Sequence, residues 1–91
     1  DQAVQVGGVN VRLDHVKTVL AAEPGVDAIA LRLGGDRLKA FVVCTAAAEA
    51  DLEARLRARA EAGLDAPARP QHYRFGRALP LSREGKAQDW D

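Results

Sequence analysis

Short stretches of apolar residues, several of them alternating with polar ones, predict strands along most of this chain. Valines flank the Gly-Gly pair at 7–8, which predicts a two-stranded hairpin turning at residues that tolerate positive φ. Two further runs, 28–33 and 38–43, bracket Gly-Gly-Asp at 34–36 and predict a second hairpin. An edge strand beside this hairpin is expected at 71–75, after a connection that two prolines hold extended.

Apolar residues three and four positions apart predict two helices. Leu13, Val16 and Leu20 place the first helix over 13–23, before a Pro-Gly pair. The region 48–62 is rich in Ala, Leu, Glu and Arg, which predicts a second amphipathic helix. The order β-β-α-β-β-α-β predicts an α+β domain, with a small mixed sheet of about three strands, two flanking helices and an N-terminal two-stranded hairpin.

Length and charge narrow the class of protein. A chain of 91 residues makes one small domain. Its 13 basic and 13 acidic residues balance, so no long-range field draws it to nucleic acid or to an anionic membrane. No apolar stretch approaches the ~20 residues of a membrane span, and no signal segment opens the chain. We therefore expect a soluble, cytoplasmic protein.

The chain offers few residues for redox or metal chemistry. Cys44 is the single cysteine and lies in an apolar run, which predicts a buried thiol in a reducing compartment. His15 and His72 have no acidic or cysteine neighbours at metal-ligand spacing, so we interpret them as ordinary helix and strand residues and predict no metal site. The sequence also has no phosphate-cradling glycine loop and no paired carboxylates for magnesium. We therefore predict that these residues alone have no enzymatic activity.

One motif near the end of the chain carries a specific resemblance. The run Leu79-Pro80-Leu81-Ser82-Arg83-Glu84-Gly85-Lys86 places a lysine on a glycine-containing loop directly after a strand-like segment. It resembles the Leu-Pro-x-Ser/Thr-x-x-Gly-Lys signature near the C-terminus of AMP-forming adenylating enzymes, a superfamily of acyl- and aryl-CoA ligases, peptide-synthetase adenylation domains and luciferases. Residues 1–11, 15–25, 37–43 and 66–70 resemble further segments of the same C-terminal domain. Within the superfamily, the aryl-CoA (4-coumarate-CoA-like) ligases are the most similar.

The resemblance implies that Lys86 is the catalytic lysine of adenylation, with Ser82 and Gly85 as supporting residues of the motif. Attack of a carboxylate on the α-phosphate of ATP brings two anions together, so an ammonium that contacts both lowers the barrier electrostatically. Such a lysine serves the adenylating half-reaction only. The alternative is that Lys86 is one of 13 basic residues on a solvated loop.

The resemblance assigns three other roles. Gly7, Gly8 and Val9 would line the tunnel for the pantetheine thiol, where two glycines let the backbone approach a thin ligand closely; an ordinary hairpin turn is the alternative. Asp1 resembles the hinge residue that swings the domain between its two poses. Arg69 resembles a basic residue that contacts the CoA phosphates, for which a guanidinium is well suited; a surface arginine near a turn is the alternative.

Residues 1–91 are therefore expected to form the mobile C-terminal lid of an ATP-dependent, AMP-forming carboxylate-activating ligase. The chain has no methionine and opens inside a patterned segment, so we expect it to be a piece of a larger protein. ATP and CoA would be substrates. A large N-terminal domain would select the acid and supply most of the contacts to Mg²⁺. Two alternatives stay open: the lid of an enzyme that loads carrier-protein pantetheine, and a catalytically silent binding module of the same fold.

Overall fold

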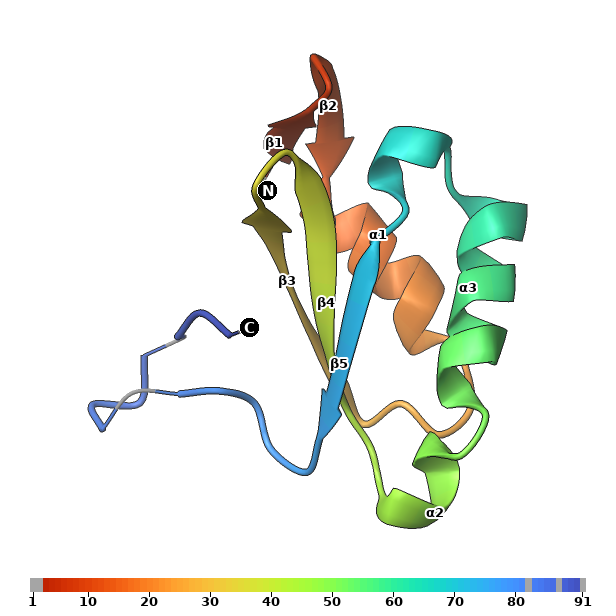
Figure 1. Ribbon diagram of the computed structural model, residues 1–91, viewed down its shortest axis with the longest axis vertical. Coiled ribbons are helices and arrows are strands. Elements are labelled where there is room, and N and C mark those ends of the chain that lie inside the picture. The colour runs from red at the N-terminus through yellow and green to blue at the C-terminus, as the bar shows by residue number, and fades with distance from the viewer. Residues whose placement is uncertain (1–2, 82, 87, 91) are drawn as a thin grey trace.

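The computed structural model of the chain describes residues 3–81, 83–86 and 88–90. In chain order its elements are β1 (Ala3–Val6), β2 (Val9–Arg12), α1 (Leu13–Ala21), β3 (Ala28–Gly34), β4 (Arg37–Val43), α2 (Ala46–Glu49), α3 (Leu52–Gly63), the short 3₁₀ helix η1 (Ala66–Ala68) and β5 (His72–Gly76). β1 and β2 pair as a separate antiparallel sheet, and β3, β4 and β5 form a three-stranded sheet with β4 in the middle. This arrangement confirms the predicted α+β class and the N-terminal hairpin (Figure 1).

The three-stranded sheet is mixed because its outer strands reach β4 by different routes. β3 and β4 are joined by a tight turn and pair antiparallel, with Gly34 opposite Arg37. β5 returns after α2 and α3 and pairs with β4 in the parallel direction, as a crossover through helices permits. α1 and α3 lie on one side of this sheet, and the segment after β5 lies on the other (Figure 1).

The alternation of residues along β4 separates two faces of the sheet. Leu38, Ala40 and Val42 are fully buried, whereas Lys39 and Phe41 are only half-buried and point to the opposite face. The helices complete the core against the first face with Val16, Leu20, Leu52, Leu56 and Ala60. Since full burial of a leucine side chain contributes about 2 kcal/mol, the helix-covered face supplies most of the stability.

The helix boundaries differ from the predicted ranges. The first helix ends at Ala21 rather than at residue 23, and the predicted helix over 48–62 is divided into α2 and α3. The division falls at Asp51, whose φ of −126° and ψ of 14° leave the helical region. Its carboxylate accepts a hydrogen bond from Arg55 Nε at 3.3 Å. A short polar side chain of this kind readily interrupts a helix, because it competes for local hydrogen bonds.

A buried carboxylate joins α1 to α3. Glu23 is only 9% exposed, and it accepts hydrogen bonds from Arg59 Nε at 2.9 Å and from Arg55 Nη1 at 2.5 Å. These two guanidinium groups hold the pKa of Glu23 below its usual range, Arg59 contributing most, although burial acts in the opposite direction. The charge is therefore accommodated because it is paired on both oxygens.

Cys44 is 2% exposed, which confirms the predicted buried thiol. Arg77, just after β5, donates a hydrogen bond to the Cys44 carbonyl oxygen at 3.0 Å and pairs with Glu49 of α2 at 2.7 Å. These contacts fix the point where the C-terminal segment leaves the sheet. In the part of the chain that the structure describes, no helix has both the length and the apolar character needed to cross a membrane.

Candidate functional site

The lysine predicted to be catalytic lies on an exposed loop of the C-terminal segment. Lys86 is exposed and directly follows Gly85, whose φ is +81°. A Cβ added at Gly85 would meet no atom within 4 Å, so the glycine is required by the backbone conformation and not by crowding. Residues 83–86 form a turn and bend that belong to no helix or strand. Ser82, the other polar residue of the motif, lies outside the described residues.

The base of this loop is anchored, a feature that was not predicted from the sequence. The Gln88 amide donates a hydrogen bond to the Pro80 carbonyl oxygen at 3.0 Å. Beyond it, Trp90 packs edge-on against Phe41 of β4. The half-buried outward face of β4 is thus covered by the end of the chain. The sequence signal was present, because Phe41 and the long stem of Lys39 lie on the face opposite Leu38, Ala40 and Val42, and an apolar group on each face of a strand needs a cover.

The second predicted surface is the tip of the β1–β2 hairpin. Gly7 has a φ of +57° and Gly8 a φ of +82°, and Val6 pairs with Val9 across the turn. Two consecutive positive φ values define a two-residue hairpin loop of the type that matches the strand twist. A Cβ added at either glycine would meet no atom within 4 Å. The backbone of the tip is therefore open to an approaching ligand.

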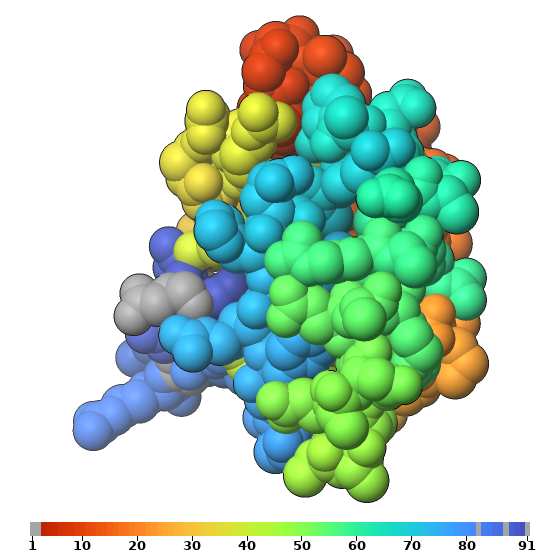
Figure 2. All heavy atoms as spheres, turned by 45° about the vertical axis from the view of Figure 1, so that its right-hand side comes forward, coloured from red at the N-terminus to blue at the C-terminus, as the bar shows by residue number. Residues whose placement is uncertain are grey.

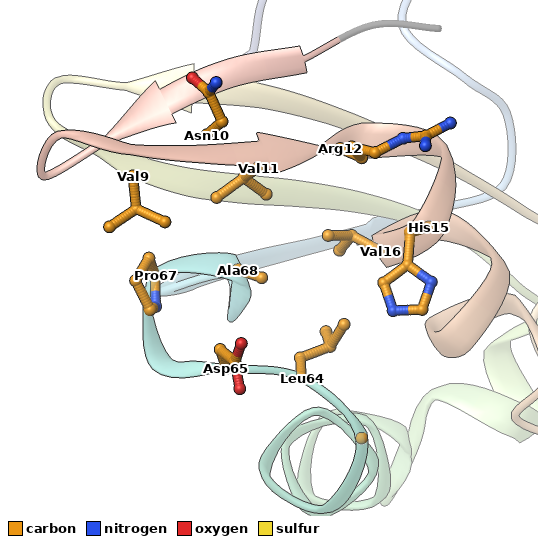
Figure 3. Close-up of a pocket in the computed structure, with 11 residues that line it drawn as sticks. Val9, Asn10, Val11, Arg12, His15, Val16, Leu64, Asp65, Pro67 and Ala68 are labelled. Atoms are coloured by element: carbon orange, nitrogen blue, oxygen red, sulfur yellow. The ribbon is translucent and has the colours of Figure 1, made fainter.

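A pocket of about 260 Å³ lies below this hairpin, between β2, the start of α1 and the segment after α3 (Figure 3). Val9, which is 48% exposed, points across it toward Pro67, while Asn10 points to the other side of the strand. The wall of the pocket is mixed, because Arg12, His15 and Asp65 line it together with apolar residues. The sequence did not reveal this pocket, because its walls come from segments far apart in the chain.

Arg69 follows η1 and is turned toward the end of α3. Its Nε donates to the Leu64 carbonyl oxygen at 2.9 Å, and its Nη2 donates to the Glu61 carbonyl oxygen at 3.3 Å. Carbonyl groups at a helix C-terminus lack partners within the helix and carry partial negative charge, so this guanidinium caps α3. This role was not predicted from the sequence, because nothing in the local pattern specifies where the side chain turns.

The surface beside Arg69 contains a half-buried tyrosine, Tyr73. Arg69 and Tyr73 line a shallow pocket of about 230 Å³, and the Arg57 guanidinium lies 4.8 Å from the centre of the Tyr73 ring. Burial raises the pKa of Tyr73 to about 12, and within the described residues its hydroxyl has no hydrogen-bond partner. Tyr73 is therefore neutral at physiological pH and serves as an apolar wall.

The structure does not bring all the predicted residues together. η1 packs against β2, so Arg69 and the hairpin belong to one region, which Figure 2 shows at the top of the molecule. The segment after β5, which carries Lys86, lies low on the opposite side of the sheet (Figure 1). Asp1, the predicted hinge, lies outside the described residues. The candidate residues thus form two separate surfaces.

Neither surface contains a metal centre made by the described residues. Within residues 3–81, 83–86 and 88–90, no three histidine, cysteine or acidic side chains are grouped so as to hold a metal ion. His15 lies in α1 and His72 in β5, and both are exposed. The candidate residues on these two surfaces that the structure describes thus offer the exposed ammonium group of Lys86, a glycine-rich backbone and the guanidinium of Arg69.

These features define a small α+β domain with two groups of candidate residues, one at the hairpin and the segment after α3 and the other in the segment after β5. The family model described as the AMP-binding enzyme C-terminal domain matches residues 15–86. The chain belongs to this family. The match confirms the resemblance found in the sequence, and it ends on the lysine of the motif.

Curated relatives and a solved structure are also similar to this chain. The chain is 88% identical over 91 residues to a 4-coumarate–CoA ligase of Rhodobacter capsulatus, covering 100% of this chain and 24% of the relative. A 4-coumarate–CoA ligase of Cereibacter sphaeroides is 44% identical over 99% of this chain and 22% of its own length. The solved structure of the amide bond synthetase McbA from Marinactinospora thermotolerans is 29% identical, with a TM-score of 0.76 over 93% of this chain and 18% of its own. The chain thus spans about a quarter of its curated relatives.

Proposed function

We propose that this chain is the mobile C-terminal domain of an ATP-dependent, AMP-forming acyl- or aryl-CoA ligase. The observation that carries the proposal is an exposed lysine directly after a glycine with positive φ, at the end of the segment that matches the family. The name of the relatives supports an aryl acid of the coumarate type as the substrate class. A large N-terminal domain of the same polypeptide would complete the active site.

Lys86 would act in the first half-reaction, in which the acid attacks the α-phosphate of ATP and pyrophosphate leaves. The ammonium group contacts both the attacking carboxylate and the phosphate, and so offsets the repulsion between them as charge builds at phosphorus. An exposed loop is suited to this role because the lysine must enter a pocket made by another domain. Lysine supplies a compact charge on a long flexible stem, which reaches further than most side chains.

The hairpin tip would act in the second half-reaction, in which a thiol attacks the acyl-adenylate and AMP leaves. Gly7, Gly8 and Val9 would line the tunnel for the pantetheine arm through their backbone, since the glycines carry no side chain to block it. Arg69 would pair with the CoA phosphates by the guanidinium edge that does not cap α3. Asp1 would be the hinge about which the domain rotates between the two steps.

ATP and CoA would bind as substrates, and Mg²⁺ would accompany the ATP phosphates. Among the described residues of this chain, no three histidine, cysteine or acidic side chains are grouped so as to hold a metal ion, and we assign the Mg²⁺ site to the N-terminal domain. Lys86 and Mg²⁺ would then share the neutralisation of the phosphate charge.

The main alternative within this proposal concerns the thiol that accepts the acyl group, which is either CoA or the pantetheine arm of a carrier protein. Carrier proteins present the same pantetheine arm as CoA, so a hairpin tip that fits one also fits the other. Arg69 favours CoA, because carrier-bound pantetheine lacks the nucleotide phosphates that an arginine would recognise. A catalytically silent module is disfavoured by the 88% identity to a named ligase and by the presence of Gly85 and Lys86.

The test is a pair of half-reaction assays on the full-length ligase carrying Lys86→Ala. We expect adenylate formation to fall by about 10²- to 10³-fold, as when one preorganised charge-stabilising group is removed, while CoA transfer from supplied acyl-adenylate stays near the wild-type rate. Arg83→Ala is the matched control, because it removes a positive charge from the same exposed loop. Equal effects of the two substitutions, or an unchanged first step in Lys86→Ala, would refute the role of Lys86.

A further inference from the structure

The position of the lysine loop depends on the residues that follow it. The hydrogen bond from the Gln88 amide to the Pro80 carbonyl oxygen, at 3.0 Å, closes the loop at its base. Lys86 precedes Gln88 by two residues, and two residues span at most about 7 Å. Whatever holds Gln88 in place therefore confines the backbone of Lys86.

The two residues after Gln88 attach this base to the second face of the sheet. Asp89 Oδ1 lies 2.6 Å from Lys39 Nζ and 3.5 Å from Arg32 Nε. The Trp90 ring lies edge-on to Phe41, with ring centroids 5.7 Å apart, and Lys39 Nζ lies 5.0 Å from the Trp90 ring centroid. Lys39 also donates a hydrogen bond to the Trp90 carbonyl oxygen. We name the contacts of Asp89 and Trp90 with Lys39 and Phe41 the C-terminal clasp.

The clasp is built around a partly buried cation. The side chain of Lys39 is only 13% exposed, so its ammonium group needs partners, and the C-terminal segment supplies a carboxylate, a carbonyl oxygen and an aromatic ring. The hydrogen bond from Lys39 holds the pKa of Asp89 below its usual range. Since Asp89 itself is 62% exposed, the ion pair adds little to stability. Its main consequence is where it places the chain.

We propose that Asp89 and Trp90 are positioning residues for Lys86: by attaching the end of the chain to Lys39 and Phe41, they fix where the lysine loop stands on the domain. This inference rests on the proposed function of Lys86. Among the described residues, the contacts that make up the clasp include neither the glycines of the hairpin tip nor Arg69. The clasp therefore serves adenylate formation and not thioester formation.

The experiment measures both half-reactions in the full-length ligase carrying Trp90→Ala. A displacement of about 1 Å can cost on the order of 100-fold in rate, so we expect adenylate formation to fall by about 10- to 100-fold and CoA transfer from supplied acyl-adenylate to stay near wild type. Trp90→Phe keeps a ring against Phe41 and is expected to restore most of the rate. Asp89→Asn, which removes only the charge, is expected to give a smaller loss of the same step.

A double variant separates positioning from general damage. If Trp90 acts through Lys86, then Trp90→Ala has little further effect on adenylate formation once Lys86→Ala is present. Lys39→Met should behave like Trp90→Ala. Lys17→Met, on the exposed surface of α1, is the matched control and should leave both half-reactions unchanged.

The outcomes distinguish this inference from the function on which it rests. A selective, ring-dependent loss that vanishes in the Lys86→Ala background supports the clasp as a positioning device. A loss of adenylation in Lys86→Ala but not in Trp90→Ala overturns the role of the clasp alone. Two other results do the same: an equal loss of both half-reactions in Trp90→Ala, and a loss of adenylation in Trp90→Ala that adds in full to the loss in Lys86→Ala. An unchanged first step in Lys86→Ala overturns both proposals.

Discussion

The two glycine-bearing loops of this domain are built in different ways. The hairpin tip is a two-residue turn held on both sides by paired strands, and both of its glycines have positive φ. The described residues of the lysine loop, 83–86, belong to no strand or helix, and the contacts that hold the loop include a backbone hydrogen bond at its base and side-chain contacts after it. The first is a rigid backbone surface, and the second presents a side chain from a tethered segment.

This difference matches the two tasks proposed for the loops. A tunnel wall for a thin thiol arm needs backbone that does not move and carries no side chains. A lysine that must enter the pocket of another domain needs reach and exposure, with its base fixed well enough to aim it. The same residue type, glycine, would thus allow the close approach of a ligand in one loop, whereas it permits a sharp change of chain direction in the other.

The largest effect in the hairpin is expected from Gly8→Val. A β-branched residue at a φ of +82° is strained by roughly 1–2 kcal/mol, and its side chain would enter space that is open in the structure. We expect CoA transfer from supplied acyl-adenylate to slow by about 10- to 100-fold, with adenylate formation little changed.

Gly35→Val is the matched control for this prediction. Gly35 has a φ of +71° in the β3–β4 turn and is equally open, so the two variants should lose similar stability in chemical unfolding. Only Gly8→Val should slow thiol transfer. If both variants slow it alike, the effect is one of strain, and the hairpin tip has no special role.

The next largest effect is expected from a change that restricts rotation of the whole domain, which would bring first one surface and then the other to the active site. If Asp1 is the hinge, Asp1→Pro in the full-length ligase should restrict the change in backbone angles by which one loop replaces the other at the active site. We expect the overall reaction, measured from ATP, acid and CoA, to slow by about 10-fold while at least one isolated half-reaction keeps its rate. Wild-type rates in the overall reaction and in both half-reactions would remove the hinge assignment.

The smallest effect is expected at Arg69, where two roles meet. Arg69→Ala removes two hydrogen bonds to the end of α3, which should lower the free energy of unfolding by about 1 kcal/mol. Loss of a phosphate contact should also raise the KM for CoA by roughly 10-fold and leave the KM for ATP unchanged. A loss of stability with an unchanged KM for CoA would make Arg69 a helix cap only.

Local patterns predicted the elements, whereas contacts between distant segments escaped prediction. The hairpin at 7–8 and the buried face of β4 follow from turn chemistry and period-two alternation, which act within a few residues. The motif that ends at Lys86 was likewise recognisable as a continuous run of residues. The break at Asp51 was missed, because helix propensity is summed over a window and one residue decides the interruption.

The parts of the site that need tertiary structure could not be predicted from the chain. The pocket beside Val9, the capping role of Arg69 and the clasp around Lys39 each depend on where a segment returns. Of the predicted residues, Asp1 and Ser82 lie outside the described part of the chain, so their roles stay predictions. The roles of the remaining site residues also stay predictions until the assays are done.

The two loops are proposed to serve different half-reactions, and the most direct measurement compares both half-reactions in Lys86→Ala and Gly8→Val of the full-length ligase side by side. We predict opposite losses: Lys86→Ala loses adenylate formation and keeps CoA transfer, whereas Gly8→Val keeps adenylate formation and loses CoA transfer. The same half-reaction failing in both variants would contradict this division of labour, because one shared surface would then explain both loops.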